Sequence, residues 1–186
     1  MEFTQTKLAG VVLLTPRRFG DDRGWFSETW NARALAQGGI DADFVQDNHS
    51  MSTQAGTLRG LHYQSPPHAQ AKLVRCTVGV IFDVAVDVRV GSPTYGDWVG
   101  YDLSVQNGCQ LYIPAGFLHG FVTRSADAEV QYKCTDYYAP EADGAVAWNS
   151  CGVDWGLTGD PVLSDKDRKA PQFGDWTSPF TMGNAR

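Results

Sequence analysis

The feature that most constrains the fold is a run of β-forming residues in the middle of the chain. Residues 72–90 read KLVRCTVGVIFDVAVDVRV, a segment rich in Val and Ile that is split by Gly79. Such a run predicts two strands joined by a tight turn at the glycine. In the second half, alternate side chains point to opposite faces, with Phe82, Val84, Val86 and Val88 on one face and Asp83, Ala85, Asp87 and Arg89 on the other.

Four more strand-like segments follow, each bounded by Gly, Pro, Asn or Asp: residues 98–105, 109–114, 120–124 and 128–140. Many short strands at this spacing predict an all-β sandwich or barrel. Helical signal is sparse. One short helix is expected from an Asn31 cap to Gln37, and another from Ser164 to a point before Pro171. The length favours a single domain over residues 1–186, with the aromatic C-terminal tail packed irregularly over the barrel.

The charge balance excludes several classes of partner. A net charge of −6 and a pI of about 5.0 argue against a general nucleic-acid or anionic-membrane binder, because such partners are met by basic surfaces. An anionic small ligand remains compatible with a local Arg/Lys cluster. No stretch approaches the roughly 20 apolar residues of a membrane span, and the N-terminus does not read as a secretion signal. The four cysteines form no CxxC pair, which favours reduced, mostly buried thiols and a cytoplasmic location.

A second constraint is the stretch LRGLHYQ at residues 58–64. Arg59 and His62 are its most chemically capable side chains, yet strict alternation on a strand would place them on opposite faces. Either only one of them points into a cavity, or the strand breaks its alternation at Gly60.

The segment GCQLYIPAGFLHG, residues 108–120, resembles the second sequence motif of the cupin superfamily, in which a Pro-x-Gly turn brings a His to the mouth of a jelly-roll barrel. Metal-binding cupins add an HxH pair and a Glu from an earlier strand, and this chain has only His62 there. A catalytic transition metal needs three or four placed ligands. The spacing of His62, His119 and Asp83 does not require such a site, so no metal is expected.

Eight collinear motifs between residues 15 and 167 resemble the dTDP-4-dehydrorhamnose 3,5-epimerase family of metal-free cupins: FGDDRGWFSETW, FVQDNHS, GTLRGLHYQ, AQAKLVRC, GVIFDVAVDVRVGSPTYG, IPAGFLHGF, YKCTDYYAPEADG and LSDKD. The resemblance implies a homodimeric cupin jelly roll that epimerises C3 and C5 of a dTDP-4-keto-6-deoxyhexose without a cofactor. The alternatives are a 3-only or 5-only epimerase, a ketoisomerase of a related dTDP-sugar, and a non-catalytic sugar-binding cupin. Intact acid and base residues disfavour the last.

The resemblance also implies catalytic roles. His62 matches the family's base, Tyr132 its proton donor, and Lys72 is a cation suited to an enolate oxygen. Asp167 matches the carboxylate behind the base. Without the resemblance, Asp167 would rather be one half of an S-x-x-D capping box with Ser164; with it, the His–Asp dyad is the stronger interpretation.

Further positions match the family's substrate contacts. Arg23 and Arg59 are expected at the diphosphate, where guanidinium groups give bidentate contacts. The other expected contacts are Phe26, Glu28, Gln46, Asp47 and Asn48 around the thymidine, Tyr138 at the sugar, and His119, Lys166 and Asp143, the last standing where the family commonly has Glu.

Three structural expectations complete the analysis. His119 and Asp83 are expected to pair, because burying either ionisable group alone would be costly. If Arg59 and His62 both reach the site, a bulge or twist is expected at Gly60. The apolar run VVLLT, residues 11–15, is a candidate for adding to a partner's sheet edge.

Overall fold

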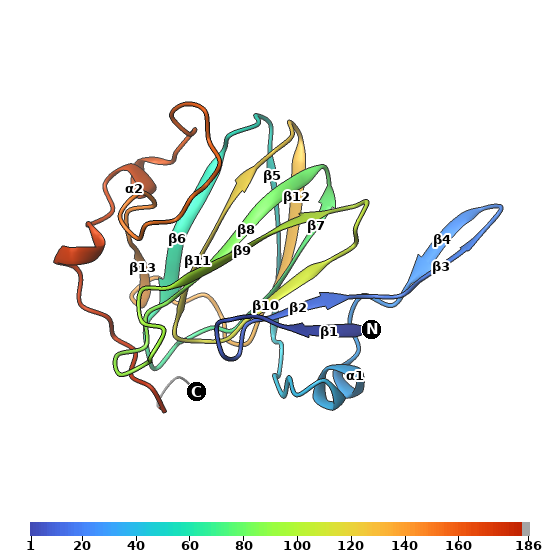
Figure 1. The fold of residues 1–186 in the computed structure, drawn as a ribbon, viewed down its shortest axis with the longest axis horizontal. Helices are drawn as coiled ribbons and strands as arrows, with labels where there is room; N and C mark the ends of the chain where they lie inside the picture. Colours follow the sequence, from blue (N-terminus) through green and yellow to red (C-terminus); the bar gives the residue numbers. More distant parts are fainter. Residues whose placement is uncertain (184–186) are drawn as a thin grey trace.

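The computed structural model describes residues 1–183, which form two packed antiparallel sheets (Figure 1). The six-stranded sheet has the order β1 (Glu2–Gln5), β2 (Val12–Thr15), β10 (Gln110–Ile113), β7 (Lys72–Val78), β12 (Ala128–Cys134) and β5 (Gln46–Ser52). The five-stranded sheet has the order β13 (Asp143–Ala145), β6 (Leu58–Gln64), β11 (Phe117–Thr123), β8 (Val80–Asp87) and β9 (Trp98–Ser104). The predicted all-β architecture is confirmed.

The main core lies between the inner faces of the two sheets. Val74, Leu111 and Val130 come from the six-stranded sheet, and Ala85 and Phe121 come from the five-stranded sheet. The predicted turn between β7 and β8 is confirmed at Gly79, whose φ of +76° suits a residue without a Cβ.

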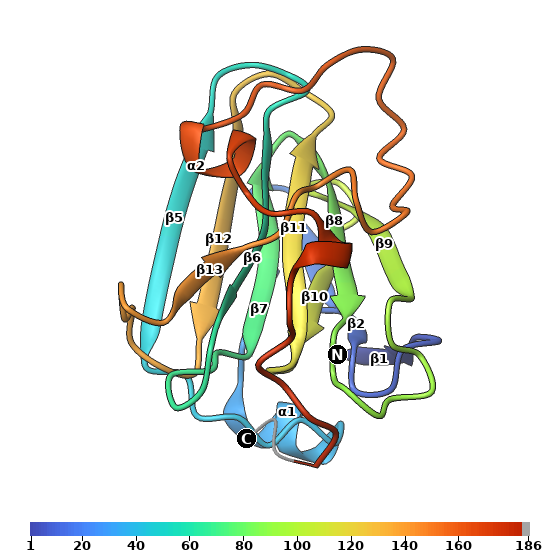
Figure 2. The same ribbon diagram turned by 90° about the vertical axis from the view of Figure 1, so that its left-hand side faces the viewer.

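A second core lies on the outer face of the five-stranded sheet, beneath the C-terminal part of the chain (Figure 2). The apolar stripe predicted for β8 points into this layer, where Val84 and Val86 pack with Trp155 and Phe180. The opposite face of β8, which includes Asp83, therefore points toward the interior between the sheets. The C-terminal segment and the outer face of the sheet form an apolar core of their own. Part of the space between the two sheets can therefore hold polar groups.

Both predicted helices are present. Helix α1 (Ala32–Gln37) begins after Asn31, whose Oδ1 accepts a hydrogen bond from Ala34 N at 3.2 Å. Helix α2 (Asp165–Arg168) begins after Ser164. A 3₁₀ turn, η1 (Phe173–Asp175), belongs to the tail, which packs over the five-stranded sheet as expected. Within residues 1–183, none of these helices is long and apolar enough to cross a membrane.

The N-terminal part contains a hairpin that leaves the body of the molecule. Its strands, β3 (Arg18–Asp21) and β4 (Gly24–Ser27), pair only with each other and project beyond the six-stranded sheet (Figure 1). The run VVLLT behaves differently from the expectation. Its strand β2 is bonded to β1 on one side and β10 on the other, so both of its edges are occupied and it cannot extend a partner's sheet.

Candidate active site

Two adjoining cavities open at one end of the sandwich. The first, of about 370 Å³, is called the His62 pocket; the second, of about 380 Å³, is called the Tyr138 pocket. His62, Lys72 and Tyr132 line both of them. His62 comes from the five-stranded sheet and the other two from the six-stranded sheet, so the shared region is enclosed by side chains from opposite layers.

The break in alternation at Gly60 brings Arg59 and His62 to the same pocket. Both side chains line the His62 pocket, while Leu58 and Leu61 both point into the outer core. The pairing of β6 with β11 shifts register here, Gly60 has φ +131°, and an added Cβ would lie 2.6 Å from the Cα of Gly120. The expected irregularity at Gly60 is confirmed, and only glycine fits it.

His62 is backed by a buried carboxylate. Its Nε2 lies 2.5 Å from Oδ1 of Asp167, on α2. The other oxygen, Oδ2, accepts from Ser164 Oγ at 2.9 Å, and Ser164 Oγ in turn accepts from Asp167 N at 3.1 Å. Burial acts to raise the pKa of Asp167, but hydrogen bonds from His62, Ser164 and the Gly60 N–H, with the His62 charge, leave it below its usual value.

Lys72 and Tyr132 face His62 from the other layer. Burial lowers the pKa of Lys72, although the nearby Cys134 and Asp143 act in the opposite direction. Burial also raises the pKa of Tyr132, so its phenol keeps its proton. The Lys72 Nζ lies 5.9 Å from the centre of the Tyr132 ring. The pocket thus brings the Lys72 amine and a protonated phenol together.

The expected pair between His119 and Asp83 is confirmed, with Nε2 and Oδ1 2.8 Å apart in a buried position. Burial lowers the pKa of His119 more than the carboxylate raises it. His119 also borders the His62 pocket. Within residues 1–183, the second oxygen of Asp83 has no hydrogen-bond partner.

Arg59 is held at the rim of the His62 pocket by β5. Its Nε donates to Ser52 Oγ at 3.2 Å and its terminal nitrogen to the Met51 carbonyl at 3.0 Å. These bonds leave guanidinium N–H groups for an anion. The rim therefore carries a fixed positive charge.

The Tyr138 pocket gathers most of the remaining predicted residues. Lys166 forms an ion pair with Asp143, and the Tyr138 hydroxyl lies 3.4 Å from the same carboxylate. Gln46 Nε2 donates a hydrogen bond to Asn48 Oδ1 at 3.1 Å. All five residues line this pocket.

Four predicted residues lie outside both pockets. Asp47 points to the outer face of the six-stranded sheet, where its carboxylate binds Lys133 Nζ at 3.0 Å. Strand alternation explains this, since its neighbours on β5 point inward. Glu28 borders the same outer cavity, of about 510 Å³. Arg23 and Phe26 lie on the projecting hairpin. The Arg23 side chain is 90% exposed, and Phe26 as a whole residue is 69% exposed.

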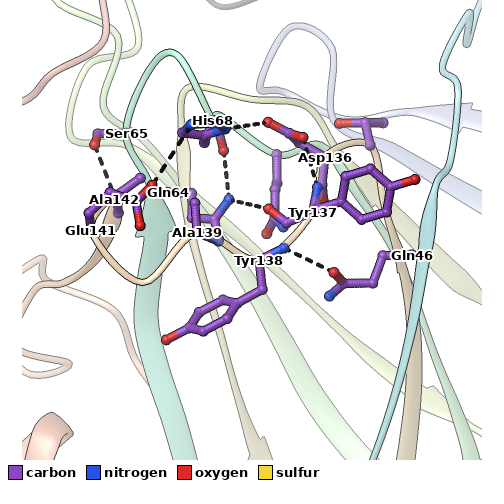
Figure 3. Close-up of polar contacts among 12 residues, drawn as sticks. Gln46, Gln64, Ser65, His68, Asp136, Tyr137, Tyr138, Ala139, Glu141 and Ala142 are labelled. Carbon is purple, nitrogen blue, oxygen red and sulfur yellow. Dashed lines mark hydrogen bonds and ion pairs between the residues drawn. The ribbon is translucent and has the colours of Figure 1, made fainter.

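Sequence reasoning missed Gln64, the last residue of β6. It is buried and forms hydrogen bonds to three backbone groups of the neighbouring loops (Figure 3). The available signal was a long amide side chain on the last residue of the strand. Within residues 1–183, no three His, Cys, Asp or Glu side chains come together in a way that could hold a metal ion.

Comparison with known proteins adds an independent line of support. The sequence profile described as dTDP-4-dehydrorhamnose 3,5-epimerase matches residues 5–175. A Pseudomonas aeruginosa protein of that name is 52% identical over 178 residues, covering 94% of this chain and 97% of the relative.

Two solved structures are also closely similar. The Bacillus anthracis dTDP-4-dehydrorhamnose 3,5-epimerase with TDP and PPi bound has a TM-score of 0.90 at 46% identity, covering 92% of this chain and 99% of that one. The Legionella pneumophila dTDP-6-deoxy-D-glucose-3,5-epimerase in complex with dTDP-4-keto-L-rhamnose has a TM-score of 0.88 at 45% identity, covering 93% of both chains. With a profile that matches most of its length and relatives at this identity, the chain belongs to the dTDP-4-dehydrorhamnose 3,5-epimerase family.

Proposed function

We propose that this protein converts dTDP-4-dehydro-6-deoxyglucose to dTDP-4-dehydrorhamnose by inverting C3 and C5. The observation that carries the proposal is the placement of His62 and Tyr132 on opposite sheets around one cavity. Inversion needs a proton removed from one face of a carbon and returned to the other face. A base and an acid that approach from opposite layers provide that geometry.

The chemistry starts at the carbons next to the ketone. The C4 carbonyl acidifies the hydrogens on C3 and C5, so His62 takes one of them and becomes an imidazolium that Asp167 stabilises. The electron pair moves to the carbonyl oxygen, giving an enolate whose charge is matched by Lys72. Tyr132 then gives its proton to the carbon from the opposite face, and solvent restores both side chains.

The parts of the substrate beyond the reacting carbons account for the rim and the Tyr138 pocket. Arg59 is assigned to the diphosphate, because it lines the His62 pocket and its guanidinium suits a phosphate group. The assigned contacts in the Tyr138 pocket are Tyr138, Gln46, Asn48, Lys166 and Asp143. An unphosphorylated 4-keto sugar should therefore be a very poor substrate.

Proton NMR in deuterated water tests the proposal. The expected result is conversion of the dTDP-4-keto sugar with deuterium at both C3 and C5, unchanged by a chelator. Label at one carbon only, after prolonged incubation, would make the protein a 3-only or 5-only epimerase. Migration of the keto group would indicate a ketoisomerase. Binding with no exchange at either carbon would leave a sugar-binding cupin.

We also propose that the working form is a homodimer in which the hairpin of one copy reaches the pocket of the other. A two-stranded hairpin is marginally stable alone, and this one exposes Phe19, Trp25 and Phe26. The predicted nucleotide contacts on it, Arg23 and Phe26, touch no cavity of their own chain among those described. A second copy packed against the outer face of the six-stranded sheet would cover these aromatics and supply both residues.

A cytoplasmic location is proposed as well. Cys76, Cys134 and Cys151 are buried free thiols, and Cys109 is also unpaired. A reducing compartment is where such thiols persist.

A further inference from the structure

The loop of residues 135–142, between β12 and β13, carries Tyr138 over the pocket that bears its name (Figure 3). The tyrosine itself is 59% exposed, so core packing does not fix its ring. Its hydroxyl has one long contact, 3.4 Å to Asp143. The position of this side chain therefore depends on how its backbone is held.

Side-chain amides hold the peptide groups on both sides of Tyr138. Before it, the Tyr137 carbonyl accepts from Gln64 Nε2 at 3.2 Å, and the Tyr138 N–H donates to Gln46 Oε1 at 2.9 Å. After it, the Ala139 N–H donates to Gln64 Oε1 at 2.9 Å. Gln46 lies on the six-stranded sheet and Gln64 on the five-stranded sheet, so the two layers grip one residue between them.

Gln64 is committed to this task by its own surroundings. It is only 4% exposed, and a third bond, from Nε2 to the His68 carbonyl at 2.7 Å, ties the loop to the β6–β7 connection. Both amide hydrogens and the amide oxygen are thus in use. A Glu here would turn a carboxylate oxygen toward two carbonyls, and an apolar residue would leave three backbone groups without these hydrogen bonds. The chemistry of the site calls for an amide.

We propose that Gln64 is a positioning residue that fixes Tyr138 over the substrate pocket and so sets affinity for the sugar nucleotide. The expected effect of Gln64 on substrate affinity rests on the proposed function. In the part of the chain that the structure describes, the Gln64 side chain forms no hydrogen bond with His62, Tyr132 or Lys72. Its loss should therefore weaken substrate binding rather than slow the proton transfers. The effect should pass entirely through Tyr138.

Amide hydrogen exchange tests the anchoring without any substrate. In Gln64→Met, a variant of similar side-chain length, the Ala139 amide is expected to exchange about tenfold faster, the consequence of losing one hydrogen bond. The matched control is Ser65→Ala, which removes a 3.3 Å bond to the Ala142 carbonyl of the same loop but none around Tyr138. Unchanged exchange at Ala139 in a folded Gln64→Met protein would overturn the proposal. If that variant does not fold, Gln64→Asn keeps the amide but shortens its reach, and the same loss of protection is expected.

A double-mutant cycle tests the link to affinity. Gln64→Met should raise KM about tenfold with kcat changed less than about twofold, as expected when ground-state and transition-state binding fall together. In a Tyr138→Ala background, Gln64→Met should raise KM no further. The same additional rise in that background would overturn the proposal. A different pair of results would reject the proposed function and leave the anchoring intact. In that case the wild-type protein has no epimerase activity, yet the Ala139 amide still exchanges faster in Gln64→Met.

Discussion

The carboxylate of Asp167 lies 2.5 Å from His62 through Oδ1 and accepts from Ser164 Oγ through Oδ2, while the same Oγ caps helix α2 by accepting from Asp167 N. The capping box and the dyad had been competing interpretations of one short motif. The structure shows the dyad together with the Ser164 cap, because the cap uses the Asp167 N–H and the dyad uses the Asp167 carboxylate. The cap fixes the first turn of α2, and that turn aims the remaining oxygen at the imidazole.

The dyad gives a first prediction. Asp167→Asn should lower kcat by about 10²- to 10⁴-fold, because the neutral amide neither stabilises the imidazolium nor fixes the tautomer. Ser164→Ala is the control. It should cost about 1 kcal/mol of stability through the lost cap while keeping most of the activity. Steady-state kinetics with thermal unfolding of both variants separates the two roles, and equal losses of kcat would contradict this assignment.

The depressed pKa of Asp167 predicts a pH-dependent stability. Its folded pKa lies below the unfolded value of about 3.9. Its ionisation therefore stabilises the fold fully above that value, and the contribution disappears as the pH falls through the folded pKa. Urea unfolding should show wild type more stable than Asp167→Asn at pH 7, with the gap narrowing below pH about 4. A gap that widens toward acid would refute the sign.

Gly60 offers a test of the break in alternation. Gly60→Ala should destabilise the protein by more than the roughly 1–3 kcal/mol of an unfavourable backbone conformation alone, because its Cβ would also meet Gly120 at 2.6 Å. Gly24→Ala is the matched control, since Gly24 has φ +130° but nothing within 4 Å of an added Cβ. Chemical denaturation of both variants measures the difference. Equal losses would mean that the close approach to β11 does not matter.

The proposed exchange of hairpins can be checked by complementation. His62→Asn and Phe26→Ala homodimers should each have little activity. A heterodimer of the two, purified through separate tags, contains one pocket with an intact His62 and an intact Phe26 from the other copy. It should regain up to about half of the wild-type kcat per dimer, since one site of two is whole. No gain would show that each hairpin serves its own chain.

Tyr132→Phe should separate the two proton transfers. The substitution removes the only acidic group of the side chain, so reprotonation should slow more than proton loss. Net conversion is expected to fall by about 10²- to 10⁴-fold, while deuterium exchange at unreacted substrate persists. Tyr112→Phe, on the outward face of β10, is the control and should behave as wild type. Parallel loss of exchange and conversion would argue against Tyr132 as the donor.

Local patterns predicted most of the fold. Alternation gave the strands, Gly79 gave the turn between β7 and β8, and Asn31 and Ser164 gave both helix caps. The assignment of the β8 faces needed more than alternation. Either face could have been interior, and the choice depends on the C-terminal segment that covers the more apolar side, which is a long-range contact.

The sequence predicted the site best for residues that line a single pocket within one copy of the chain. Motif positions indicated His62, Lys72 and Tyr132, which the structure brings together. Asp47 could have been placed by counting along β5, because Gln46 and Asn48 share the opposite face. Gln64 was not predictable, since its role depends on the path of two loops that have no periodicity of their own.

The thickness of the sandwich has a chemical meaning. Packed sheets lie about 10 Å apart, and side chains from both layers fill that gap, so a sugar ring needs the cavity lined by His62 and Tyr132. A hexose bound there would meet a side chain of one sheet on one face and a side chain of the other sheet on its opposite face. The arrangement of two β layers, a property of the scaffold, thereby determines at which face of the sugar each proton leaves and returns.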